Sequence, residues 1–275
     1  MSDVWSALKK VHGGSTRQET KKKLFNHVWG QMRMHHERKP PLINIPEKSD
    51  FVKSRKAKIV YSNMNKLDGY LDINDDKIFL VIRSSLRSKP RKLRTVIAHE
   101  LGHTFLLDIE NRPIEPYYSS SLTTHQRWEQ VEGLAFEIGR QILVPEVLMK
   151  KYVHSIPSLE LFIKLKRTFR VTTHVIARRL VHDLKLWDAY LFASSFDSKH
   201  RGFSIPRHSN RFKAKESFRN FRLDKYWNKI EPLLSKNPSD EVAESCFAKL
   251  GRRFYRIETK MVKDSNWVLC LLTKI

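Results

Sequence analysis

A short stretch near the middle of the chain, "AHELGH" at residues 98–103, places two histidines four residues apart with a glutamate directly after the first. On an α-helix, His99 and His103 lie about 40° apart and one turn up, so both point toward the same place. Two imidazoles in this arrangement can bind one zinc-like ion, and Glu100 on the flank can accept a proton from an attacking water. The pattern predicts a metal site that cleaves peptide bonds. The alternative is two ordinary histidines on an amphipathic helix.

A catalytic metal site needs a third protein ligand and one open coordination position. The extended form of the pattern would require glycine and histidine where the chain has Leu106 and Ile109. A glutamate on the following helix is the other choice, and the helical wheel of that segment favours Glu132, which lies inside the apolar arc, over Glu129 and Glu137. The arc consists of Trp128, Val131, Leu134, Ala135, Phe136, Ile138, Ile142 and Leu143.

A carboxylate inside an apolar arc costs free energy unless a cation meets it or a proton neutralises it. A metal ion shared with His99 and His103 would be such a cation, whereas a salt bridge to Arg140 is the alternative. We therefore expect one divalent ion, zinc in the first place and manganese in the second, held by His99, His103 and Glu132. Glu100 is then the catalytic base.

Helices and a small sheet must position these residues. Short β-rich runs at 58–62, 69–73 and 77–82 predict a small antiparallel sheet ahead of the site. Two helices at 93–107 and 127–144 carry the candidate ligands, and Pro145 ends the second.

Segments on either side of this region have patterns of their own. Residues 1–40 look helical and basic, and residues 158–186 read as a helix, a tight turn and a second helix. Further on, strands are expected at 187–196, 254–262 and 267–275, with helical stretches around 224–235 and 240–250.

Two sequence blocks around the site resemble a known family. "RTVIAHELGHTFL" followed by "EGLAFEIGRQILVP" resembles the ImmA/IrrE metallopeptidases, whose pattern is H-E-x-x-H and then E-x-x-A-N-x-F-A-x-x-L-L-x-P. His99, Glu100 and His103 match the first block, and the second is occupied by Glu132, Ala135, Ile138, Gly139, Ile142, Leu143 and Pro145. The resemblance covers about residues 55–190. The chain departs from it at Phe136, where the family usually has asparagine.

The resemblance and the element pattern together imply an α+β protein in three parts. Residues 1–156 would form a zincin-like metallopeptidase domain with a basic N-terminal helical region. Residues 157–187 would form a helix-turn-helix-like unit, and residues 188–275 a C-terminal α+β domain at the place where IrrE-like proteins carry a GAF-like sensor domain.

The resemblance also implies a function, namely cleavage in the cytoplasm of a DNA-binding repressor, often one with a helix-turn-helix. Tyr117, Tyr118 and His125 lie between the two site helices and are candidates for stabilising the developing oxyanion. The alternative function is a nucleic-acid-binding transcriptional or stress regulator whose peptidase site is vestigial.

The charge of the chain points to an anionic partner. With 52 Lys and Arg against 29 Asp and Glu, the net charge is +23, and nucleic acid is the first candidate partner. Candidate nucleic-acid-binding residues lie in the second helix of the helix pair and in the basic, aromatic segment 199–227: Arg178, Arg179, Arg211, Lys213 and Lys215. A cationic face that receives an acidic protein, or a plain solvated surface, is the alternative.

Membrane association and disulfides are not expected. No stretch reaches the roughly 18 uninterrupted apolar residues that a membrane span requires, and the N-terminus lacks the apolar run of a signal peptide. These features predict a cytoplasmic protein with no membrane partner. Cys246 and Cys270 lie in apolar surroundings and are expected to be free thiols.

Overall fold

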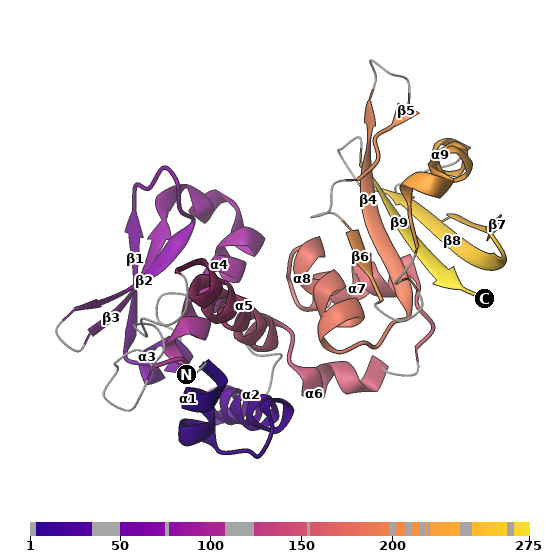
Figure 1. The fold of residues 1–275 in the computed structure, drawn as a ribbon. Coiled ribbons are helices and arrows are strands. Elements are labelled where there is room, and N and C mark those ends of the chain that lie inside the picture. Colours follow the sequence, from indigo (N-terminus) through magenta and orange to yellow (C-terminus); the bar gives the residue numbers. More distant parts are fainter. Residues whose placement is uncertain are drawn as a thin grey trace. The chain divides into compact units, whose positions relative to one another are not determined.

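The chain folds into two units, which are described separately below (Figure 1). One comprises Met1–Leu148 with Phe169–Thr172, and the other comprises Met149–Thr168 with Thr173–Ile275. The computed structural model describes residues 4–34, 50–74, 77–107, 124–152, 155–197, 202–206, 211–214, 218, 221–236, 244–262 and 267–275. The mixture of helices and sheets agrees with the predicted α+β class.

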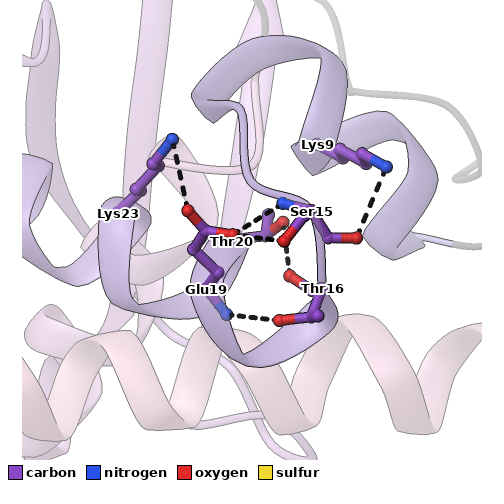
Figure 2. A network of polar contacts seen from close by, with 6 residues as sticks. All are labelled: Lys9, Ser15, Thr16, Glu19, Thr20 and Lys23. Atoms are coloured by element: carbon purple, nitrogen blue, oxygen red, sulfur yellow. Dashed lines mark hydrogen bonds and ion pairs between the residues drawn. The ribbon is translucent and has the colours of Figure 1, made fainter.

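The first unit begins with two helices, α1 (Val4–His12) and α2 (Arg17–Met34), as the basic N-terminal segment predicted. A polar network at the turn between them fixes where α2 starts (Figure 2). The Glu19 amide donates to the Thr16 hydroxyl at 3.2 Å, while the amide and hydroxyl of Ser15 donate to a Glu19 carboxylate oxygen at 2.8 and 2.6 Å. This reciprocal capping satisfies amides that the first helical turn leaves without partners.

A three-stranded sheet follows the short helix α3 (Asp50–Ser54). Its strands β1 (Ala57–Ser62), β2 (Gly69–Asn74) and β3 (Lys77–Arg83) have the order β1-β3-β2. β2 pairs with β3 antiparallel, but β1 and β3 run parallel, so the expectation of a purely antiparallel sheet was wrong. β3 is a nearly continuous apolar run and occupies the centre of the sheet. It lies between β1 and β2, and it runs in the same direction as β1.

The two predicted site helices are present. After the 3-10 turn Ser84–Ser88, α4 (Pro90–Thr104) starts with a proline at its first turn and packs on β2 and β3. α5 (Thr124–Leu143) packs along α4 and ends just before Pro145, as predicted. The short helix α6 (Glu146–Met149) and the 3-10 turn Lys150–Tyr152 follow.

The second unit contains a six-stranded sheet, in which all described strand pairs are antiparallel. The main path runs β5-β4-β9-β8-β7, and β6 pairs with β4. The strands are β4 (Ala189–Asp197), β5 (Gly202–Phe203), β6 (Arg211–Lys213), β7 (Glu244–Leu250), β8 (Arg253–Met261) and β9 (Trp267–Lys274). A 3-10 turn (Asp224–Tyr226) and α9 (Trp227–Lys236) occupy the first predicted helical stretch of this region.

The second predicted helical stretch, around 240–250, was wrong, because residues 244–250 form strand β7. Two residues, Gly251 and Arg252, connect β7 to β8, and Gly251 has a φ of +68°, which suits a tight hairpin turn. The turn lies within the sequence "LGRR" at residues 250–253. It joins the two strands so that their pairing begins with Leu250 opposite Arg253.

The helix pair predicted for 157–187 consists of α7 (Leu159–Thr168) and α8 (Thr173–Arg178), and a π-helical turn (Arg179–Asp183) extends α8. These helices pack on the sheet: the buried Glu258 carboxylate accepts the Leu159 amide at 2.7 Å, and the rings of His174 and Phe212 lie 5.0 Å apart. Both helices belong to the same compact unit as the C-terminal sheet.

Two smaller expectations concern cysteines and membranes. Cys246 is half-buried, Cys270 is buried, and both are free thiols, as predicted. Among the described residues, no helix combines the length and the apolar character that crossing a membrane requires.

Candidate metal centre

The candidate site lies where α4 and α5 cross at close range. A Cβ atom added to Gly102 on α4 would collide with the Ala135 carbonyl of α5, and one added to Gly139 on α5 would lie 2.8 Å from the Ala98 carbonyl. Each helix thus presents a glycine to the backbone of the other. Since the two backbones nearly touch, short side chains can bridge them, and Glu132 of α5 reaches the histidines of α4.

The structure brings three predicted ligands together. Nε2 of His99 lies 3.0 Å from one oxygen of Glu132, Nε2 of His103 lies 3.2 Å from the other, and the two Nε2 atoms are 3.3 Å apart. Two ligand atoms on a tetrahedral zinc ion are separated by about 3.3 Å, given Zn–N distances of about 2.0–2.1 Å. The donor set therefore fits a small divalent ion in both chemistry and spacing.

Electrostatics at the site favour ligand-competent protonation states. Burial lowers the pKa of His99, which favours a neutral imidazole. Burial alone would raise the pKa of Glu132, but hydrogen bonds from His103 and His99 outweigh it and lower the pKa to about 2. A carboxylate held ionised beside imidazole nitrogens is the arrangement that a cation would stabilise further.

Glu100 occupies a different environment from Glu132. Its side chain is only 3% exposed, and burial, reinforced by the nearby Glu132 charge, raises its pKa to about 7. His99, Glu100 and His103 each offer a ligand atom within 4.8 Å of one another. A Cβ atom at Gly69 of β2 would lie 3.0 Å from the Glu100 carboxylate, so the missing side chain at Gly69 leaves room for that group.

Phe136 behaves differently from the rest of its apolar arc. Val131, Leu134, Ala135, Ile138, Ile142 and Leu143 are buried as the wheel predicted, but the Phe136 side chain is 45% exposed. Its ring stacks on His99 with centroids 3.8 Å apart and planes 25° apart. The Nδ1 atom of His99 is buried and has no hydrogen-bond partner among the described residues. A ring contact thus takes the place where a hydrogen bond would usually orient a ligand histidine.

Other candidates lie away from the centre or outside the described residues. Glu137, one alternative carboxylate, pairs with Lys21 of α2 at 2.6 Å. The Glu129 side chain, the other alternative, lies outside the described part of the structure, as do Tyr117, Tyr118 and the side chain of His125.

The described candidate nucleic-acid residues lie in the second unit, on α8 with its π-helical turn and on β6. Arg178 is exposed, whereas Arg179 is 1% exposed and pairs with Asp183 at 3.5 Å, so its guanidinium does not reach the surface. Arg211 is half-buried and donates to the Pro206 carbonyl at 2.6 Å, and Lys213 is also half-buried. Lys215 lies outside the described residues.

Comparison with known proteins agrees with this geometry. A family model described as the IrrE N-terminal-like domain, of peptidase family M78, matches residues 52–181, which include all four site residues. No curated protein matches the chain. A solved structure titled a Mycobacterium tuberculosis transcriptional regulator is similar at 14% identity with a TM-score of 0.50, covering 98% of this chain and 94% of that chain. At that identity the likeness concerns the fold alone.

The family match confirms the resemblance that the two sequence blocks indicated. Residues 52–181 match the model of the IrrE N-terminal-like domain of the M78 peptidase family. The match includes the sheet, α4 and α5, and it extends into the helix pair.

Proposed function

We propose that this protein is a metal-dependent endopeptidase that cleaves a DNA-binding regulatory protein in the cytoplasm. The observation that carries the proposal is the convergence of two Nε2 atoms and one carboxylate at 3.0–3.3 Å from one another, with a second carboxylate, Glu100, beside them. His99, His103 and Glu132 would hold the ion, with zinc the first choice and manganese the second.

The residues at the site divide the chemistry between them. When bound, the divalent ion would polarise the scissile carbonyl and acidify the attacking water. Glu100 takes the proton from that water and delivers it to the leaving amine, and its buried carboxylate lies beside the two histidines. Glu132 cannot share this task, since its low pKa keeps it ionised and its two oxygens face the two histidines.

A regulatory substrate is supported by the family resemblance. The match to the IrrE N-terminal-like domain favours limited proteolysis. A repressor with a helix-turn-helix is the substrate class that the sequence resemblance suggests. The positive charge of the chain, +23, would assist encounter with a protein that is acidic or bound to DNA.

The substitution Glu100→Gln tests the mechanism, because the amide preserves shape but cannot accept a proton. Wild-type and variant protein, each loaded with zinc or manganese, are incubated with the proteome of the source cells, and newly formed N-termini are identified by mass spectrometry. We expect a cleavage site that only the wild type generates, with a loss of about 10²–10⁴-fold in the variant at equal metal content. Equal cleavage by both proteins would remove Glu100 as the base.

A second function, a nucleic-acid-binding regulator with a silent peptidase site, is favoured by two observations. The chain carries a large positive charge, and Phe136 stands where a hydrogen-bonding residue is expected. If wild-type protein binds zinc stoichiometrically but generates no new N-terminus, the result supports this second function over the endopeptidase function.

A further inference from the structure

The β7–β8 hairpin of the second unit carries two exposed aromatic side chains, and the Lys249 ammonium lies 5.6 Å from the ring centroid of one of them, Phe254. Phe247 is 70% exposed and Phe254 is 54% exposed, although both lie in well-paired strands. β7 is the last strand on the main path of the sheet (Figure 1). Large apolar side chains exposed together on a sheet face indicate an interaction surface.

The strand register places these rings on one face with basic side chains between them. Phe247 lies opposite Arg256, and Lys249 lies opposite Phe254. Phe247 and Lys249 are two residues apart in one strand, so they share a face, as do Phe254 and Arg256 in the other. Aromatic and basic side chains therefore alternate both along each strand and across the strand pair. The two rings are diagonal neighbours about 7–8 Å apart, so one ligand can contact both.

The turn end of the hairpin is basic, and the acidic residues of its strands, Glu244 and Glu258, lie at the other end. Residues 245–257 contain Lys249, Arg252, Arg253 and Arg256 and no acidic residue. Lys249, Arg252 and Arg253 are exposed, while Arg256 is half-buried and pairs with Glu258 at 2.8 Å. Glu258 also accepts the first amide of α7, so it is buried at the far end of this face and does not neutralise the exposed end.

We propose that this face with its adjoining turn, which we call the hairpin surface (Phe247, Lys249 and Phe254, with Arg252 in the turn), binds single-stranded nucleic acid. Aromatic rings on a sheet face offer stacking platforms to unpaired bases, and interleaved cations contact the phosphates between them. In a duplex the faces of the bases are stacked inside the helix, so the rings would have nothing to stack on. The surface is separate from the residues of the metal centre, and its function does not depend on proteolysis.

Fluorescence anisotropy with a labelled 12-residue oligothymidylate tests the proposal on the full chain. We expect binding that weakens with salt, at least tenfold weaker binding to a duplex of equal length, and about tenfold weaker binding of the oligothymidylate by each of Phe247→Ala and Phe254→Ala. Phe247→Leu should weaken binding as much as Phe247→Ala, because leucine keeps the apolar character but provides no ring to stack on. Both rings are largely exposed, so circular dichroism and thermal unfolding of these variants should match the wild type.

Two matched double variants distinguish binding at the hairpin surface from attraction by the overall positive charge of the chain. Lys249→Gln with Arg252→Gln should lower the slope of log affinity against log salt by about 1.4, because each phosphate that the protein no longer neutralises reduces the slope by about 0.7. Lys10→Gln with Lys22→Gln removes the same charge from exposed positions of α1 and α2 and should leave the slope unchanged. Wild-type affinity in the phenylalanine variants, equal slopes in the two charge variants, or preference for a duplex or for vesicles containing phosphatidylserine would each overturn the proposal.

Discussion

The ring of Phe136 lies over the ring of His99 with 3.8 Å between centroids, and this contact takes the place of a hydrogen bond at the candidate metal centre. His99 Nδ1 is buried without a hydrogen-bond partner among the described residues, so no described hydrogen bond at Nδ1 orients the ring. The stacking contact limits rotation of the imidazole, and rotation would move Nε2 away from Glu132. We therefore expect Phe136 to position His99, a predicted metal ligand.

Removing the Phe136 ring should weaken metal binding. We expect Phe136→Ala to lower zinc affinity about tenfold, because the imidazole is then free to rotate away from the ligand position. Phe136→Tyr keeps a stacking ring and should stay near wild type. Competition against a chelating dye measures the affinity, with Phe247→Ala as the control for removal of an exposed phenylalanine in the other unit. Unchanged affinity in Phe136→Ala would mean that the stacking does not position His99.

A methyl group at Gly69 should disturb Glu100 without disturbing the metal ligands. The added Cβ would lie 2.6 Å from Val96 and 3.0 Å from the Glu100 carboxylate, so that carboxylate must shift. We expect Gly69→Ala to cleave the identified substrate about 10–100-fold more slowly at unchanged zinc content, because a displaced base transfers protons poorly. Asp72→Ala in the same strand is the control, since this side chain is exposed. Reduced zinc content in Gly69→Ala would point instead to damage at the ligands.

Helical periodicity was sufficient to predict the centre of the site but not its surroundings. The spacing of His99 and His103 and the apolar arc around Glu132 are local features, and the structure brings these side chains together as the spacing required. The parallel pairing of β1 with β3 is not local, since it depends on which strand occupies the middle of the sheet.

Other differences arise where tertiary packing outweighs residue type. Phe136 belongs to the apolar arc by residue type, yet it lies exposed over an imidazole, because α4 and α5 meet along the glycines beside it. Arg179 looked like a surface cation, but the π-helical turn at the end of α8 buries it beside Asp183. Neither outcome could be read from a helical wheel.

Stability should fall in acid through a half-buried histidine near the N-terminus, His12. Burial, with His27 and Arg55 nearby, lowers the pKa of His12 to about 4. Between about pH 6.5 and 4 the unfolded chain binds a proton that the folded chain does not, so stability present above pH 6.5 is lost as the pH falls toward 4. We expect a falling Tm over this range at constant ionic strength and a smaller fall in His12→Gln.

His174→Gln is the matched control for this titration, because His174 is exposed on α8 in the second unit. Its Tm should decline with pH as steeply as that of the wild type. An equally steep decline in His12→Gln would assign the acid sensitivity to other groups. His27, whose pKa burial also lowers, would then be the next to replace.

The close crossing of α4 and α5 should prove necessary for both stability and metal binding. Alanine at Gly139 would place its Cβ 2.8 Å from the Ala98 carbonyl and 3.0 Å from the Cα of His99, so the helices must move apart. Overpacking of this kind costs about 1–3 kcal/mol, and the separation also draws Glu132 away from the histidines. We expect Gly139→Ala to lose zinc and to unfold at lower denaturant concentration.

Gly133, next to the predicted ligand Glu132, supplies the control for that crossing. A Cβ atom there would have nothing within 4 Å, and the position is exposed, so Gly133→Ala should keep its zinc. Alanine is also the better helix former by about 1 kcal/mol, so this variant should be as stable as the wild type or more stable. Zinc per chain and urea unfolding of the two variants give the comparison. If Gly139→Ala kept zinc and stability as well as Gly133→Ala does, close contact of the helices would not be what brings Glu132 to the site.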